Sequence, residues 1–325
     1  MPLATRLTEA LGIRHPILLA PMGSIAGGRL AAAVTAAGGL GLIGGGYGDA
    51  EWLEREFAAA GNHRVGCGFI TWSLARRPEL LAQTLAHGPA AVMLSFGDPK
   101  PFAPAIKAAG AKLICQVQTL AHVDDALAAG AEIIVAQGSE AGGHGLTRAT
   151  LPLVPQVVDR VRQRAPEAMV VAAGGIGDGR GLAAALMLGA EGVLVGTRFY
   201  ASEESLARPR AKAQMVEATG EETIRTSVFD TVRGITWPKG FTGRALNNEF
   251  AQRWHGAEAD LSGAVEREMA RYQAAAAVGD FATAVIFGGE AMGLFDRVLP
   301  AGEIVNSMVA EAESALHAGA QRIAG

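Results

Sequence analysis

The sequence has little cysteine, and its two cysteines are far apart. Cys67 and Cys115 lie in separate apolar runs without the CxxC spacing of a redox or zinc motif. Isolated thiols of this kind are typical of buried residues in a reducing compartment. The sequence also lacks an apolar run of about 18 residues that could span a membrane and an apolar signal-peptide core near its start. These absences predict a cytoplasmic protein without a membrane partner.

Strong charge of either sign is also absent. The 325 residues carry a formal net charge of −4, and their 28 lysines and arginines are scattered without a basic run. Nucleic-acid and anionic-membrane surfaces normally need clustered positive charge, so we expect neither partner. Half of the residues are hydrophobic, which allows one large α/β domain or two smaller ones.

Metal-binding and dinucleotide-binding motifs are missing as well. The seven histidines show neither HxxxH spacing nor a paired carboxylate typical of zinc. The chain has no GxxxxGK[ST] phosphate loop, and its "GGIGDG" does not match the GxGxxG fingerprint. We therefore expect no metal ion and no separate nicotinamide-nucleotide domain.

Eight short apolar runs alternate with Ala-rich helical stretches in the first 200 residues. Each run is too short for a buried helix and lacks polar alternation, as in strands buried on both faces of a parallel sheet. The runs are 16–22, 39–45, 64–70, 90–96, 112–118, 132–138, 169–175 and 192–197. Several helical stretches end at a glycine one or two residues before the next run, as in "AAGAEIIVA". Eight such units predict a closed (β/α)8 TIM barrel, with an open doubly wound sheet as the alternative.

The composition changes after about residue 200. Residues 206–280 are more charged and lose the strand pattern, which predicts a mostly helical insertion or lid beside the barrel mouth. The barrel itself would then comprise residues 1–205 and 281–325. We expect residues 226–250 to be irregular. Trp237 and Trp254 would either cover the pocket or form a subunit contact, so the sequence allows a homodimer.

The predicted strand ends carry glycine or small polar residues. In (β/α)8 barrels the catalytic groups lie at the C-terminal ends of the strands. A single glycine can simply end a strand tightly, but eight such ends, with Gly68 and Gln116 among them, predict room for a flat ligand across the mouth. Loops after the seventh and eighth strands commonly bind phosphate. Gly175, Gly196 and Thr197 lie there, and one phosphate, as in FMN, fits better than a dinucleotide.

The stretch "GSEAGGHG" follows the sixth apolar run and holds one imidazole among four glycines. Glycines allow a ligand to approach the backbone closely, and an imidazole beside that ligand can exchange protons near neutral pH. His144 is therefore the candidate catalytic residue. The other six histidines are expected at surfaces, helix ends or in the insertion.

Several motifs together resemble the nitronate monooxygenase family of flavin enzymes. They are "PILLAPM", "FGDP", "AQGSEAGGHG", "AAGGIGDGRGLAAALMLGAEGVLVGTRF" and "GGEAMGLFDRVLPAGEIV", and they cover nearly the whole chain in matching order. The resemblance implies FMN as cofactor, a nitronate or nitroalkane with O2 as substrates, a carbonyl compound and nitrite as products, and His144 as the catalytic base. It also implies flavin contacts from Pro21, Met22, Gly23, Gln137, Gly142 and Gly143, and phosphate contacts from Gly174, Gly175, Gly196 and Thr197.

The chain departs from the family pattern in one motif. Family members often have "GVN" after the third strand, whereas this chain has Gly66, Cys67 and Gly68. Either a water or Thr71 replaces that side chain, or the substrate differs. The chain has only three tyrosines, so we expect Phe, Met or Trp around the substrate where some relatives have tyrosine.

Two other functions stay open. Related flavin enzymes that reduce quinones or enoyl thioesters with NAD(P)H carry similar elements. A non-flavin phosphate-binding barrel, such as an aldolase, would need a lysine or carboxylate base at the C-terminal end of a strand. Most of the five lysines of the chain lie away from the predicted strand ends.

Overall fold

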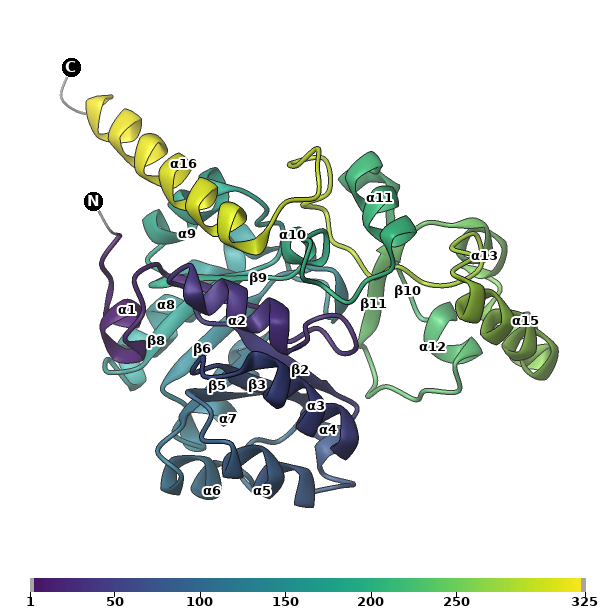
Figure 1. Ribbon diagram of the computed structural model, residues 1–325, viewed down its shortest axis with the longest axis horizontal. Coiled ribbons are helices and arrows are strands. Elements are labelled where there is room, and N and C mark those ends of the chain that lie inside the picture. Colours follow the sequence, from purple (N-terminus) through teal and green to yellow (C-terminus); the bar gives the residue numbers. More distant parts are fainter. Residues whose placement is uncertain (1–2, 323–325) are drawn as a thin grey trace.

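The computed structural model describes residues 3–322 and confirms the (β/α)8 barrel (Figure 1). Its eight parallel strands follow the order β1-β9-β8-β6-β5-β4-β3-β2, and a bridge between Leu18 and Leu40 joins the two ends of the sheet. The strands are β1 (Ile17–Leu19), β2 (Leu42–Gly46), β3 (Gly66–Ile70), β4 (Ala91–Ser95), β5 (Lys112–Val117), β6 (Ile133–Gln137), β8 (Met169–Ala173) and β9 (Gly192–Val195). Each lies within one of the predicted runs, except that β2 extends one residue further, to Gly46. Residues 1–2 and 323–325 of the predicted barrel segments lie outside the described residues.

A ring of helices surrounds these strands. The helices are α2 (Gly28–Ala36), α3 (Ala50–Ala60), α4 (Thr71–Leu74), α5 (Glu79–Ala86), α6 (Ala103–Ala108), α7 (Leu120–Ala128), α8 (Thr150–Arg164), α9 (Gly179–Met187) and α16 (Ala301–Gln321). Leu7 and Leu11 of α1 (Arg6–Leu11) pack in the same cluster as the barrel interior, so α1 closes the N-terminal end of the barrel.

Strand alternation separates the barrel interior from the core beneath the helices. In β5, Leu113 and Cys115 belong to the outer core, whereas Ile114 belongs to the interior cluster. Gln116 is the next interior position, because side chains of a strand alternate between its faces. Apolar side chains fill the barrel interior below Gln116, toward the N-terminal ends of the strands. The space for a ligand therefore lies at the C-terminal ends of the strands.

The insertion after β9 lies on the side of the barrel away from the two termini (Figure 1). It follows α10 (Thr197–Tyr200) and contains α11 (Pro209–Glu217), the 3-10 helix η1 (Gly220–Glu222), β10 (Thr223–Thr226), α12 (Val228–Val232), β11 (Thr242–Leu246), α13 (Glu249–Trp254), α14 (Glu258–Gly263) and α15 (Val265–Val278). Phe229, Phe250 and Trp254 form part of a hydrophobic cluster of its own. Trp254 is therefore a core residue of the insertion, not an exposed one.

The prediction that residues 226–250 are irregular was wrong for most of that stretch. It contains α12 and β11, and residues 227, 233–241, 247 and 248 are the ones that lack a helix or strand. β11 lies between β10 and the short strand β7 (Gly143–Gly145) in a three-stranded antiparallel sheet. His144 is paired with Gly243 in this sheet. The insertion is thus joined by backbone pairing to the loop that carries the candidate catalytic histidine.

Candidate active site

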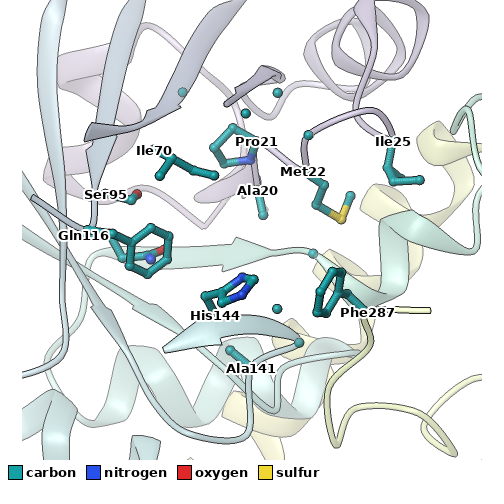
Figure 2. Close-up of a pocket in the computed structure, with 18 of the residues that line it drawn as sticks. Ala20, Pro21, Met22, Ile25, Ile70, Ser95, Gln116, Ala141, His144 and Phe287 are labelled. Atoms are coloured by element: carbon teal, nitrogen blue, oxygen red, sulfur yellow. The ribbon is translucent and has the colours of Figure 1, made fainter. Parts of the chain in front are cut away.

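A cavity of about 570 Å³ lies at the C-terminal ends of the barrel strands. Its size suits a cofactor or drug-sized ligand. Figure 2 shows Pro21 and Met22 on one side of the cavity and His144 and Phe287 on the other. All site residues predicted from the sequence line this one cavity: Pro21, Met22, Gly23, Gly68, Gln116, Gln137, Gly142, Gly143, His144, Gly174, Gly175, Gly196 and Thr197.

Gly68 lies directly against Pro21, which gives a physical reason for the missing asparagine. A Cβ atom at position 68 would lie 2.3 Å from Cγ of Pro21 and 2.6 Å from its Cβ. No side chain fits there unless Pro21 moves. Thr71 does not take its place, because it is buried and lies outside the cavity lining.

Aromatic side chains enclose the outer part of the cavity. The expectation of Phe, Met or Trp in place of tyrosine was right only in part: Phe287 and Trp237 line the cavity, but so do Tyr47, Tyr200 and Tyr272. Trp237 comes from the irregular 233–241 segment, and its Nε1 donates to the Tyr47 hydroxyl at 3.1 Å. Of the two functions considered for this tryptophan, lining the pocket is the one observed.

Unpaired backbone donors gather where β8 and β9 end. Within residues 3–322, the N–H groups of Gly175, Gly196 and Thr197 donate to no protein acceptor. Gly175 has φ +72°, a conformation that favours glycine. The Thr197 hydroxyl accepts from the Gly289 N–H at 3.0 Å, which leaves its own proton available to an acceptor. Such a group of donors suits an anion.

Three glutamines connect the barrel strands to the His144 backbone. Gln116 and Gln118 both donate to Oε1 of Gln137, at 3.1 and 2.8 Å. The Nε2 of Gln137 in turn donates to the carbonyl oxygen of His144 at 3.2 Å. Gln137 therefore positions the histidine through its main chain.

Arginines of the insertion hold the carbonyl groups of the loop before and after His144. Arg225 in β10 donates to the carbonyls of Gly145, Thr242 and Ser139 at 3.0, 2.6 and 2.9 Å. Arg244 in β11 also donates to Ser139, at 2.8 Å. These charge-assisted bonds fix the glycine-rich loop, which would otherwise be conformationally free.

The His144 ring is enclosed by groups that come mainly from the insertion. The residue is 9% exposed, and its ring stacks on Trp237 with a centroid distance of 3.6 Å and an interplanar angle of 6°. The ring centroid of Phe287 lies 5.3 Å away. His144 Nε2 lies 2.8 Å from Oδ2 of Asp230, a buried residue of α12.

The pKa of His144 is lowered from its ordinary value near 6.5. Burial is the largest cause, because it disfavours the charged imidazolium. The hydrogen bond and the negative charge of Asp230 act in the opposite direction, and the positive charges of Arg233 and Arg225 add to the lowering. The imidazole is thus neutral at neutral pH and can accept a proton.

Sequence reasoning missed Asp230, Arg233, Tyr47 and Phe287. Asp230 is one carboxylate in the apolar stretch "VFDTV", 86 residues from His144, so no spacing rule connects the two. An acidic residue on a short helix with mostly apolar neighbours was the only signal.

Among the residues described, no group of three or more His, Cys, Asp or Glu side chains could hold a metal ion. No helix in residues 3–322 has the length and hydrophobicity needed to cross a membrane.

A family model described as nitronate monooxygenase matches residues 4–62 and 74–311. The chain belongs to the nitronate monooxygenase family. A curated nitronate monooxygenase from Neurospora crassa is 33% identical over 92% of this chain and 90% of that protein. This oxidoreductase of the family therefore matches the chain along almost its whole length.

Two solved structures also resemble this member of the family. FabK from Thermotoga maritima has a TM-score of 0.85 and 30% identity, and the match covers 98% of this chain and 99% of that one. A nitroalkane oxidase from Streptomyces ansochromogenes has a TM-score of 0.81 and 28% identity, with 96% and 99% coverage. The nitronate monooxygenase barrel and its insertion are therefore shared with solved relatives.

Proposed function

We propose that this protein oxidises nitronates, and nitroalkanes through their nitronates, with O2 to a carbonyl compound and nitrite, and that it uses FMN. Family membership supports the reaction class. The single observation that carries the proposal is the location of His144, a buried imidazole with a lowered pKa on the wall of the barrel-mouth cavity.

The residues present fit FMN. The cavity has a glycine-rich wall where a ring system could lie against the backbone, and a Cβ atom at Gly143 would project into open space. Pro21, Met22, Gly23, Gly68, Gln116, Gln137, Gly142 and Gly143 would line the flavin, and the free N–H groups near Gly174, Gly175, Gly196 and Thr197 would hold its phosphate. Bound FMN would supply the electron transfer between nitronate and O2, for which side chains have no equivalent.

His144 would act as general base toward a neutral nitroalkane. The C–H bond of the carbon that bears the nitro group breaks, its proton moves to the imidazole, and the electron pair remains on the substrate as the nitronate. The lowered pKa keeps the imidazole unprotonated at neutral pH, as a base must be. The aromatic rings of Trp237 and Phe287 pack against the imidazole.

Comparison of two substrate forms tests this proposal. In the His144→Asn variant, we expect kcat/KM for the neutral nitroalkane to fall by about 10²- to 10⁴-fold, the usual contribution of a general base. Activity on the preformed nitronate should remain close to that of the wild type, since an ionised carbon needs no base. His63→Asn, at an exposed position, is the matched control. Equal losses on both substrates would exclude the base function.

A second candidate is reduction of a quinone or an enoyl thioester with NAD(P)H on the same barrel, because related flavin reductases carry elements similar to "GSEAGGH" of this chain. Anaerobic mixing of the FMN-loaded protein with NADH separates the two candidates. Rapid loss of the yellow flavin absorbance would favour the reductase, whereas an unchanged spectrum would favour the monooxygenase. A colourless preparation that cannot be reconstituted with FMN would contradict both.

A further inference from the structure

We propose that Asp230 of the insertion is a positioning residue that fixes His144 in the tautomer whose Nδ1 accepts the substrate proton. This inference rests on the proposed function of His144 as a base. It assigns a contribution to the reaction to a residue outside the barrel, in the part of the chain where the sequence offered no candidate.

The hydrogen bond between the two side chains determines the tautomer. Oδ2 of Asp230 lies 2.8 Å from Nε2 of His144, and both side chains are more than nine-tenths buried. A carboxylate oxygen only accepts hydrogen bonds, so Nε2 must carry the proton and donate it. The lone pair of the neutral ring then resides on Nδ1.

Nδ1 is the nitrogen that remains accessible. In the described chain it makes no hydrogen bond, yet it is not among the buried polar atoms that lack a partner, so it retains accessible surface. His144 lines the barrel-mouth cavity, and 9% of its surface is exposed. The basic nitrogen is therefore available to a substrate, while the opposite nitrogen is anchored.

Asp230 also stabilises the positive charge that develops on the His144 ring during proton transfer. When Nδ1 takes the proton, the imidazole becomes an imidazolium, and the carboxylate beside Nε2 attracts it. Burial of an isolated positive charge would be unfavourable without this partner. Asp230 raises the pKa of His144 by its hydrogen bond and by its charge, against the larger lowering by burial.

Other charged and titratable groups face this pair. Arg233, just after α12, has its Nη1 3.8 Å from Oδ1 of Asp230, and both atoms are buried without a hydrogen bond. The positive charge of Arg225 in β10 also lowers the pKa of His144. Tyr47 and Tyr272 also lie nearby, but burial raises their pKa values, so both stay neutral where the imidazole titrates. Asp230 is thus the group that favours the imidazolium.

Asp230→Asn and Asp230→Ala in the FMN-loaded protein test the proposal. The asparagine oxygen can still accept from Nε2, but the negative charge is lost, so we expect kcat/KM for the neutral nitroalkane to fall by about 10- to 100-fold. Activity on the preformed nitronate should be unchanged. Selective ¹⁵N-histidine NMR should report a lower pKa for His144 in Asp230→Asn, and loss of the single Nε2-protonated tautomer in Asp230→Ala.

The matched control is Glu268→Gln, a change at another buried carboxylate of the insertion. Glu268 lies in α15, is 1% exposed and pairs with Arg267 and Arg271, outside the cavity lining. We expect this variant to leave the nitroalkane-to-nitronate ratio unchanged. A purely structural function of Asp230 would lower both activities together and leave the tautomer and titration of His144 as in the wild type, and that result overturns the proposal.

The outcome can be separated from failure of the proposed function. If His144→Asn affects both substrate forms equally, the base function fails on its own test. The NMR measurement still decides whether Asp230 fixes the imidazole tautomer, because it does not depend on turnover.

Discussion

Charged side chains around His144 shift the pKa of its imidazole in opposite directions. Asp230 stabilises the protonated ring, while Arg233 and Arg225 stabilise the neutral ring. Trp237 stacks on the same ring and would favour a cation above its face. The acid limb of the pH profile of kcat/KM for a nitroalkane should report the resulting pKa of His144, since a general base works only when it is unprotonated.

Arg233→Met removes one of the positive charges that lower the pKa of His144. Without it the imidazole holds its proton to a higher pH, so the acid limb of kcat/KM for a nitroalkane should move to higher pH. The profile for the preformed nitronate should not show this shift. Arg210→Met, at an exposed position of α11, is the control. A limb that stays in place, or moves to lower pH, contradicts the assignment of that limb to His144.

At the scale of elements, the sheet β10-β11-β7 links the insertion to the catalytic loop. The guanidinium of Arg225 lies at this junction, and burial lowers its pKa to about 10. It holds carbonyl groups of β7, β11 and the loop before β7 at once. Its removal takes a donor away from the carbonyl oxygens of Gly145, Thr242 and Ser139, of which only that of Ser139 still accepts from Arg244.

Arg225→Met should therefore lower the free energy of unfolding by about 2–4 kcal/mol, because hydrogen bonds to charged groups are among the stronger ones. Denaturant titration measures this loss. At a pH above the acid limb, where the imidazole is neutral in both proteins, activity on the nitroalkane and on the nitronate should fall together, because the whole loop is loosened rather than the base alone. Arg29→Met, an exposed arginine of α2, should leave the unfolding curve unchanged. A stable variant with selective loss on the nitroalkane would contradict this view of Arg225.

The sequence predicted the barrel well but not the sheet beside it. Each barrel strand is a continuous apolar run, and glycines such as Gly110 and Gly130 follow the intervening helices with φ of +73° and +75°. β7, in contrast, has only three residues, two of them glycine, and pairs with a strand almost a hundred residues later. Such a strand has no local signal. The contact between His144 and Asp230 was hidden for the same reason.

The site residues that could be predicted are those fixed by barrel geometry. Gly175, Gly196 and Thr197 follow strands, so parallel pairing alone brings them to one edge. Trp237 was correctly singled out, but whether it lined the pocket or a subunit contact depended on long-range packing. Arg233 and Phe287 reach the cavity through the fold of the insertion and the segment after it, which no residue pattern specified.

At the scale of the whole molecule, the interior of the barrel and the insertion have separate hydrophobic clusters. The cavity lies between them, with lining residues from both. A ligand that fills this cavity binds the folded protein and not the unfolded chain, so it should stabilise both parts together.

FMN should therefore raise the thermal midpoint of the FMN-free protein as a single transition. At about 100 times its dissociation constant, a ligand adds about 2.7 kcal/mol to the stability. Riboflavin, which lacks the phosphate, should raise the midpoint less at the same concentration if the N–H groups near Gly175 and Gly196 bind that anion. Differential scanning calorimetry measures both shifts. Equal shifts for the two flavins would argue against a phosphate site there.

The pairing of His144 with Gly243 has a consequence for how enzymes of this kind could diversify. A segment that merely covered an entrance could be exchanged between relatives to alter which molecules enter. Here the exchanged segment would also carry the carboxylate and the indole that contact the histidine. Chimeras made by grafting residues 206–280 onto another barrel would thus alter reactivity and selectivity at the same time.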